Sequence, residues 1–321
     1  WDENSNKTAV TDQDNNMTTM SYDSMGNLLS VTDPLENATN FSYTADFNLL
    51  SSMKDPYGNL TMYSYDQKGN LVSIADKLNN TTSYTYDQKG RMTTMTNPQG
   101  QAITYNYDTN SNIASTIDQL GHKALFTYDQ IGNCIGIQDT KGRITTFTYD
   151  KLNRIEKAVY PDATFSAFNY DGASNKISET DPSGNTVTFT YDINNRLTKI
   201  KDPLDNSAQF LYDTEGNLLQ VVDANGHSTN FIYDKLNRLT KKTDALGNKY
   251  MYQYDKRGNK VSVTDANGNA VYYDFDALNR IKNILYPDSK TIQYTYDKLG
   301  RVQAMVDRHG TATYAYDSLS R

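Results

Sequence analysis

The sequence predicts an all-β repeat protein. Three observations support this: a tandem repeat of about 21 residues, two turn signals in each repeat, and aromatic pairs spaced for one face of a strand. No stretch shows sustained apolar periodicity of a helix. Each repeat is expected to form a β-hairpin, and the array would have on the order of thirty strands, whereas open twisted sheets rarely exceed about ten. We therefore expect a continuous spiralling sheet, built as a hollow shell or a solenoid-like wall.

The repeat begins with Tyr-Asp or a close variant of it. The sixteen starts, spaced 21 residues apart on average, are Trp1, Tyr22, Tyr43, Tyr65, Tyr86, Tyr107, Tyr128, Tyr149, Tyr170, Tyr191, Tyr212, Tyr233, Tyr254, Phe275, Tyr296 and Tyr316. Two intervals deviate, with 22 residues after Tyr43 and 20 after Tyr296. We expect residues 1–321 to form one array of about 15 units without an internal boundary. The chain begins with Trp1 and is expected to be a piece of a longer protein.

Each unit carries two turn signals of the form Asp-x-x-Gly. In the unit that starts at Tyr212 they begin at Asp213 and Asp223. Asp accepts hydrogen bonds from the backbone that follows it, and Gly supplies the positive φ of the corner. In fourteen Tyr-Asp or Phe-Asp turns the Gly slot holds Gly in seven, Asn in four and Ser in three, at Ser111, Ser174 and Ser320. Asn is the residue other than Gly that best tolerates a left-handed backbone, so the choice of residue at this position reflects backbone conformation and not chemistry. The prediction of a turn is weaker where the position holds Ser.

The segments between turns have the length of strands. Pairs such as Tyr63/Tyr65 and Phe189/Tyr191 stand at i and i+2, so they are expected on one face and can stack between repeats. The other strand carries apolar residues such as Leu197 and Ile200, an odd number of residues apart, which places them on opposite faces unless a bulge intervenes. The sequence leaves this choice open, together with whether the sheet has one layer or two.

These motifs resemble the YD repeat of bacterial Rhs and wall-associated proteins, which is related to repeats of insecticidal toxin-complex shells and animal teneurins. The resemblance rests on Tyr-Asp-x-x-Gly-Asn followed by Asp-x-x-Gly-Asn, and on Tyr-Pro-Asp variants at residues 160–162 and 286–288. It covers essentially all 321 residues. It implies a spiralling hairpin shell, which in secreted polymorphic toxins encloses an unfolded C-terminal toxin. A self-cleaving core segment and a toxin domain after Arg321 are not recognisable, so we expect shell wall alone.

Composition bounds the partners. The formal charge is −7, from 31 basic and 38 acidic residues, which disfavours nucleic-acid binding. No apolar run reaches the length of a membrane helix, so we expect no membrane insertion. We expect the chain to be secreted or displayed at the cell surface. Its expected partners are adjacent segments of its parent chain or further copies joined through open strand edges, an encapsulated toxin polypeptide, and glycans.

We expect no catalytic, cofactor or metal-binding residues, and no enzyme activity. His122, His227 and His309 lie far apart in sequence, each in a second turn, whereas catalysis and metal binding need clustered groups. Cys134 occupies a slot that holds Leu71 in another unit, so it is read as a small packed hydrophobe. No Ser-centred elbow accompanies the many Ser and Thr residues.

Weaker alternatives concern surface ligands. Rows of turn carboxylates such as Asp23, Asp66 and Asp87 could recruit calcium, although capping of their own turns explains them. Aromatic ladders could bind carbohydrate, although packing is the simpler reading. Sequons at Asn37 and Asn59 are expected by chance in a chain this rich in Asn and Thr.

Two functions remain open from the sequence. The first is a non-catalytic scaffold, the shell wall of a secreted or surface Rhs-like protein that encapsulates a toxin or partner polypeptide. The second is an extracellular adhesin or fibre-forming repeat protein, with carbohydrate binding by its aromatic ladders as one form of it. Curvature and termination would separate them, because a wall encloses a cavity whereas a fibre grows by joining open strand edges.

Overall fold

The computed structural model describes residues 1–317 of the chain. Over these residues the chain forms 30 strands and no helix, and the strands belong to one antiparallel sheet, which confirms the all-β prediction. The described part accordingly has no helix long and apolar enough to cross a membrane.

From β1 to β28 the strands alternate between a shorter odd-numbered and a longer even-numbered type, and the last pair, β29 and β30, reverses this order. The odd-numbered strands are β1 (Ala9–Thr11), β3 (Leu28–Thr32), β5 (Leu50–Lys54), β7 (Leu71–Ala75), β9 (Met92–Thr96), β11 (Ile113–Ile117), β13 (Cys134–Gln138), β15 (Ile155–Val159), β17 (Lys176–Thr180), β19 (Leu197–Lys201), β21 (Leu218–Val222), β23 (Leu239–Thr243), β25 (Lys260–Thr264), β27 (Ile281–Leu285) and β29 (Val302–Asp307). The even-numbered strands are β2 (Met17–Tyr22), β4 (Ala38–Tyr43), β6 (Leu60–Tyr65), β8 (Thr81–Tyr86), β10 (Ala102–Tyr107), β12 (Lys123–Tyr128), β14 (Ile144–Tyr149), β16 (Phe165–Tyr170), β18 (Thr186–Tyr191), β20 (Ser207–Tyr212), β22 (Ser228–Tyr233), β24 (Lys249–Tyr254), β26 (Ala270–Phe275), β28 (Thr291–Tyr296) and β30 (Gly310–Thr313).

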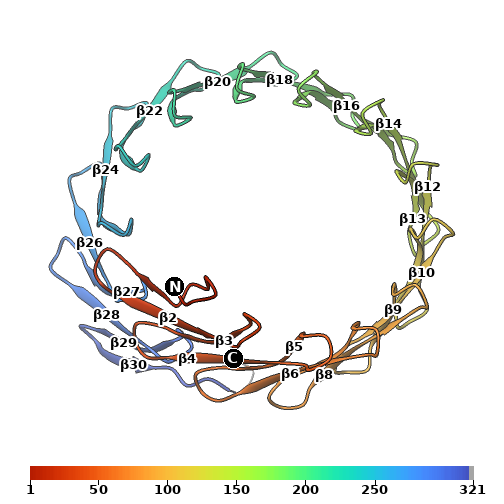
Figure 1. Ribbon diagram of the computed structural model, residues 1–321. Coiled ribbons are helices and arrows are strands. Elements are labelled where there is room, and N and C mark those ends of the chain that lie inside the picture. Colours follow the sequence, from red (N-terminus) through yellow and green to blue (C-terminus); the bar gives the residue numbers. More distant parts are fainter. Residues whose placement is uncertain (318–321) are drawn as a thin grey trace. The chain divides into compact units, whose positions relative to one another are not determined.

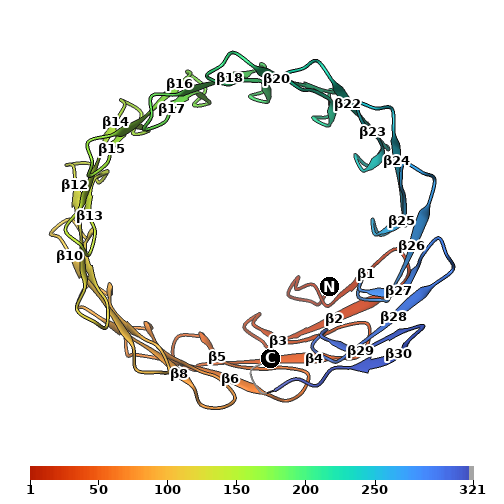
Figure 2. The ribbon, with the colours of Figure 1, turned by 180° about the vertical axis from the view of Figure 1, so that it is seen from behind.

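The chain divides into two compact units. Unit 2 is Tyr86–Asn248, and unit 1 combines Trp1–Thr85 with the residues from Lys249 onward. In unit 2, Figures 1 and 2 show each hairpin lying beside the next in chain order. In unit 1, both views show the N-terminal strands β1–β4 beside the C-terminal strands β27–β30. Whether residues 1–321 act as a single array stays a prediction.

A β-bulge where the odd-numbered strand of a Tyr-Asp hairpin begins decides which side chains share a face. In one hairpin Tyr65 pairs with Leu71 but Ser64 pairs with Ser73, so one extra residue sits between them on β7. The register then continues with Tyr63 opposite Ile74. The bulge therefore brings the oddly spaced apolar residues onto the face of the aromatic pair, which settles the question that the sequence left open.

The sheet consequently has an apolar face and a polar face. Around β18 and β19, Phe189, Tyr191, Leu197 and Ile200 share the apolar face through their pairings, whereas Thr190 pairs with a lysine on the polar face. No second layer covers either face over residues 1–317, where Ala158, at 5% exposure, is the only buried apolar residue. Stability must therefore come from neighbouring hairpins rather than from a central core.

The two deviating intervals have local causes. After Tyr43 the turn holds an additional residue, and it closes with hydrogen bonds from Thr44 N to Leu49 O (2.7 Å) and from Asn48 N to Thr44 O (3.2 Å). After Tyr296 the second turn is shorter, because Asp307 pairs directly with Gly310 across a two-residue loop. Insertions and deletions are thus absorbed in turns, and the strands keep their pairing.

Candidate functional site: the Tyr-Asp edge and the apolar face

Two rows of turns border the sheet, and both use the same hydrogen bonds. We call the row after the aromatic ends of the even-numbered strands the Tyr-Asp edge, and the other row the second-turn edge. Asp66, at the first position of a Tyr-Asp turn, accepts hydrogen bonds from the backbone N–H groups of Lys68 (2.8 Å) and Asn70 (2.9 Å) and from Asn70 Nδ2 (2.9 Å). Asp76, on the second-turn edge, accepts the same three bonds, at 2.8, 2.9 and 2.8 Å. The Asp thus satisfies the corner backbone, as its sequence pattern predicts.

The fourth position of each turn has a left-handed backbone. Gly69 has φ of 82°, and Asn153 has φ of 61°. Ser111 and Ser174, which the sequence left uncertain, adopt the same conformation, with φ of 73° and 71°. Ser320 lies outside the described residues. The fourth position is therefore selected for backbone conformation, and Ser tolerates it also at Ser5 (φ 66°) and Ser289 (φ 64°).

The turn hydrogen bonds perturb the carboxylates. The pKa values of Asp66 and Asp76 are lowered below the ordinary value of 3.8, chiefly because the side chains of Asn70 and Asn80 donate to the ionised oxygens. A hydrogen bond to a charged form favours that form. These carboxylates therefore remain ionised in the fold, and their oxygens are engaged within their own turns.

The tyrosine of each Tyr-Asp pair links two hairpins. Tyr65 Oη donates to the carbonyl oxygen of Leu50, fifteen residues earlier, at 2.9 Å. The same bond recurs at Tyr22, Tyr43, Tyr107, Tyr128, Tyr149, Tyr170, Tyr191, Tyr212, Tyr233 and Tyr296. Burial raises the pKa of Tyr65 above 10.0. The hydroxyl thus has a structural use that Phe lacks, which explains the preference for Tyr over Phe at this position of the repeat.

The fifth turn position adds a second link along the Tyr-Asp edge. Where it is Asn and the next repeat has Asn at its fourth position, the two side chains are hydrogen-bonded, as from Asn175 Nδ2 to Asn195 Oδ1 (2.9 Å). Where it is Arg, the guanidinium pairs with its own Asp and also reaches forward. Arg154 lies 2.6 Å from Asp150 and donates to the carbonyl oxygen of Asp171 at 3.0 Å. Asn and Arg therefore tie consecutive turns together on this edge.

Arginine also covers the next tyrosine ring. The Arg154 guanidinium lies 4.5 Å from the ring centre of Tyr170, within the range of a cation–π contact. The same contact occurs between Arg91 and Tyr107, at 4.4 Å, and between Arg280 and Tyr296, at 4.4 Å. The side chain thus uses its charge, its donors and its planar face at once.

The apolar face is hollowed beside the second-turn edge of unit 2. Met95, Ile103 and Leu120 contribute to the lining of a hollow of about 280 Å³, with Asn97, Gln101 and Asp118 at its polar side. Ile103 is 40% exposed and Leu120 72% exposed. This surface has the shape and apolar lining to accept apolar side chains of another polypeptide.

The three histidines lie in turns, and the cysteine lies on the apolar face of the sheet. His122 and His227 occupy the fifth position of second turns, with Nδ1 2.9 and 3.1 Å from Oδ2 of Asp118 and Asp223. His309 lies in the two-residue loop, where its N–H donates to Asp307. Cys134 pairs with Tyr128 on the apolar face. The expectation of no catalytic, cofactor or metal residues stays a prediction.

The turn carboxylates and the sequon asparagines, considered above as sites for calcium and for glycans, are all hydrogen-bonded within their own turns. Asp23 accepts the same three turn bonds as Asp66, and Asp87 accepts two backbone bonds and one from Arg91 Nε, so calcium would compete with those donors. Within residues 1–317, no group of three or more His, Cys, Asp or Glu is placed to hold a metal ion. The sequon residues Asn37 and Asn59 donate their side-chain amides to Asp33 (2.9 Å) and Asp55 (2.7 Å), as other turn asparagines do.

The antiparallel sheet and its two rows of repeated turns identify this chain as a repeat protein built from a single layer of β-hairpins. The family model described as Teneurin YD-shell matches residues 1–200, and the RHS Repeat model matches residues 212–249, 233–270 and 275–312. The chain belongs to the teneurin YD-shell family, as its Tyr-Asp motifs suggest. Among curated proteins, no sequence matches the chain.

Solved toxin structures share the fold. A Photorhabdus luminescens Tc holotoxin pore matches with a TM-score of 0.78 at 15% identity, covering 95% of this chain and 19% of that chain. The crystal structure of TcdB2-TccC3 matches with a TM-score of 0.81 at 16% identity, covering 96% of this chain and 20% of that chain. TcdB2-TccC3-Cdc42 gives 0.80 at 15% identity, with 97% and 19% covered. The chain thus spans about a fifth of the length of these structures.

The sequence reasoning missed the residues that join repeats. It treated the fifth position as part of a local turn, although the alternation of Asn and Arg there was visible, as at Asn133, Arg154, Asn175 and Arg196. It also gave no role to Arg257, which stands at a turn tip where other repeats carry residues such as Leu152 or Leu236. Other repeats carry polar residues such as Lys68 and Glu215 at the same position, so no feature of the sequence set Arg257 apart.

Proposed function

We propose that this chain is a non-catalytic scaffold, the wall of a secreted or surface-displayed shell that encloses a toxin or partner polypeptide. One observation supports this above others: a single-layer sheet presents a continuous apolar face with no layer over it in residues 1–317. Exposed apolar surface of that extent in a soluble protein marks a surface for another polypeptide. Membership of the YD-shell family supports the same role.

The toxin relatives suggest the class of cargo. The structures that share the fold are a holotoxin pore and assemblies of TcdB2 with TccC3. We infer that the partner here is likewise a toxin polypeptide, held as an extended or unfolded chain against the apolar face. An extended chain can present apolar side chains along many repeats, whereas a folded domain buries them.

Polypeptide binding tests this proposal directly. The purified chain is expected to bind reduced, carboxymethylated α-lactalbumin, a permanently unfolded probe, as measured by fluorescence anisotropy. Ile103→Lys adds charge to the apolar face and should weaken binding, whereas Thr104→Lys, on the adjacent polar face, should leave it unchanged. Equal binding by both variants, or no binding by the unmodified chain, would overturn the role of the apolar face.

Particle shape distinguishes the fibre alternative. A wall is expected to give discrete curved particles in negative-stain images, with a mass independent of protein concentration in sedimentation. Rods that lengthen with concentration would favour an adhesin or fibre joined through open strand edges.

We propose also that residues 1–321 work as one array. Because each hairpin is stabilised by its neighbours, disruption should spread between units. Hydrogen exchange after a substitution in unit 2, such as Tyr149→Ala, is expected to accelerate also in the adjoining repeats of unit 1. Acceleration that stops at the unit boundary would instead indicate two domains.

A further inference from the structure

In unit 1 the two edges of the sheet meet. The second-turn edge of the N-terminal repeats lies along the Tyr-Asp edge of the C-terminal repeats, at an offset of 241 to 243 residues. Two separate contacts follow this offset, one at Arg257 and one at Tyr57. Both use turns whose internal hydrogen bonds are already complete, so the contacts are additional to the repeat itself.

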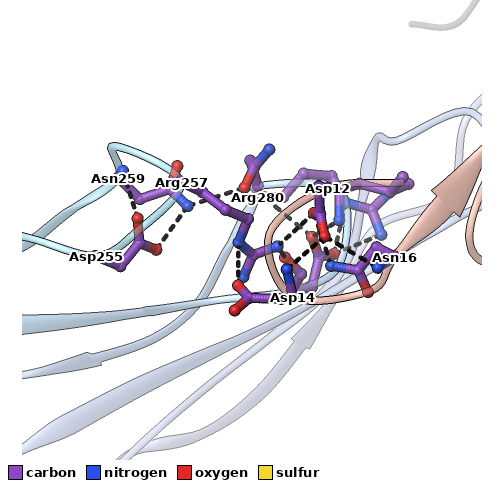
Figure 3. A network of polar contacts seen from close by, with 10 residues as sticks. Asp12, Asp14, Asn16, Asp255, Arg257, Asn259 and Arg280 are labelled. Carbon is purple, nitrogen blue, oxygen red and sulfur yellow. Dashed lines mark hydrogen bonds and ion pairs between the residues drawn. The ribbon is translucent and has the colours of Figure 1, made fainter. Parts of the chain in front are cut away.

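The first contact is an ion pair made by Arg257. Its Nε lies 2.8 Å from Asp14 Oδ2, and its Nη1 lies 3.8 Å from Asp12 Oδ2. Figure 3 shows the side chain of Arg257 pointing from its own turn into the turn that carries Asp12 and Asp14. Nη1 also donates to the carbonyl oxygen of Asp276, at 3.2 Å, in the next repeat. One side chain therefore joins the two edges and spans two repeats of one of them.

Burial makes this charge dependent on its partners. The Arg257 side chain is only 14% exposed, and its Nε makes no hydrogen bond, so the ion pair with Asp14 balances it. A guanidinium removed from water is costly unless opposite charge compensates it. Residues at the same turn position in unit 2 are open to solvent, with Ile131 at 72% and Leu236 at 70% exposure. The difference in exposure marks the place where the edges meet.

The second contact repeats the arrangement further along. Tyr57, at the tip of a second turn, accepts a hydrogen bond from the backbone N–H of Lys298 (3.2 Å). The guanidinium of Arg301 lies 6.0 Å from the Tyr57 ring centre. The backbone bond can form with many partners, whereas the Arg257 pair needs acidic residues at one position. Register is therefore set by the ion pair.

We propose that Arg257, Asp12 and Asp14 form a clasp, an interaction surface that holds the N-terminal repeats against the C-terminal repeats of unit 1 in one register. The partner that this surface fits is a second-turn edge with acidic residues at its tip. The clasp does not depend on what the apolar face encloses. Slippage by one repeat would place Arg257 beside another turn, and the N-terminal turn that follows carries Leu35 at the tip position.

Spin-label distances test the clasp in the intact chain. Labels at Gln13→Cys and Asn267→Cys, in a Cys134→Ser background, report the separation of the two segments by double electron–electron resonance. A single narrow distance is expected for the unmodified clasp. Arg257→Asp and Asp14→Arg are each expected to remove that peak in favour of longer, broader distances, and the combined charge swap should restore it.

A neighbouring charge gives the matched control. Lys256→Asp makes the same charge change one residue away, at an exposed position, and should leave the distance unchanged. Circular dichroism of each variant shows whether the hairpins remain folded. An unaltered peak in folded Arg257→Asp, or a charge swap that fails to restore it, would overturn the proposal. A peak that depends on protein concentration would do the same, because it would place the contact between copies.

Discussion

The two edges of the sheet have the same turns but different relations to neighbouring repeats. Arg143 on the second-turn edge and Arg154 on the Tyr-Asp edge both stand at the fifth turn position, each 2.6 Å from its own Asp. Arg143 is 63% exposed, whereas Arg154 is 20% exposed and bonds to the repeat that follows. Turn formation is therefore local at both edges, whereas the side-chain links between repeats are concentrated on the Tyr-Asp edge.

Acid is expected to have the largest effect, because it acts on both edges at once. The folded-state pKa of Asp66 and Asp76 is lowered, so the folded state binds fewer protons than the unfolded state near pH 3.8. Their contribution to stability is therefore fully present above that pH and is lost as pH falls below it toward the folded-state pKa. Urea midpoints are expected to stay level from about pH 7 to 5 and to drop below about pH 4.

A natural amide provides the control for acid. Asn97 stands where other second turns have Asp, and it accepts backbone bonds from Gln99 (3.0 Å) and Gln101 (2.9 Å) without carrying a charge. Hydrogen exchange should show the turns of Asp76 and Asp118 loosening in acid before the turn of Asn97. Simultaneous loosening of all three turns would contradict a carboxylate origin.

The arginine pair offers the sharpest test of the comparison between edges. Arg154→Ala removes a charged hydrogen bond and a cation–π contact between repeats, and should cost about 1–3 kcal/mol. Arg143→Ala removes only an exposed ion pair and should cost about 0–1 kcal/mol. The measurement is native-state hydrogen exchange in β15 and β17 for Arg154, and in β13 and β14 for Arg143. Equal losses would mean that the edges do not differ.

Glycine substitutions should affect the two edges equally. Gly216 on the Tyr-Asp edge and Gly226 on the second-turn edge have φ of 95° and 82°, and neither has a neighbouring atom that an added Cβ would meet. Alanine at either position is expected to cost about 1–2 kcal/mol, because only the left-handed backbone opposes it. Asparagine should cost less, as Asn237 holds that conformation naturally. Urea midpoints check both pairs, and a clear asymmetry would show that the turns are not equivalent.

The sequence predicted the features that repeat and missed those that depend on pairing. The turns at Asp66 and Asp76 and the aromatic pair Tyr63/Tyr65 follow from spacing alone, because each is decided within a few residues. The bulge beside Leu71 could not be fixed, since it depends on which residue of the partner strand opposes it. The sequence also could not predict that the sheet has a single layer, because an apolar strand face has the same residue pattern whether or not a second layer covers it.

The contact at Arg257 shows a different limit. A period of 21 residues says which residues are equivalent, but the curvature of the sheet decides which distant turns meet. Arg257 and Asp14 are separated by 243 residues, and no local rule connects them. Other repeats carry Lys, Asn or Glu as well as apolar residues at this turn position, so the sequence neither distinguishes Arg257 nor indicates its partner.

The tyrosine hydroxyl is expected to give the smallest of these effects, and it can be tested in both directions. Tyr128→Phe removes the bond to the Ile113 carbonyl oxygen (3.0 Å) while keeping the ring, and should cost about 0.5–1.5 kcal/mol. Phe275 occupies the same slot without a hydroxyl, so Phe275→Tyr should stabilise its hairpins by up to a similar amount through a bond to the carbonyl of Lys260. Hydrogen exchange in β11 and in β25 measures the two changes. If Tyr128→Phe were neutral and Phe275→Tyr destabilising, ring packing alone would join the repeats at this position, and the Tyr-Asp edge would owe its advantage to Asn and Arg.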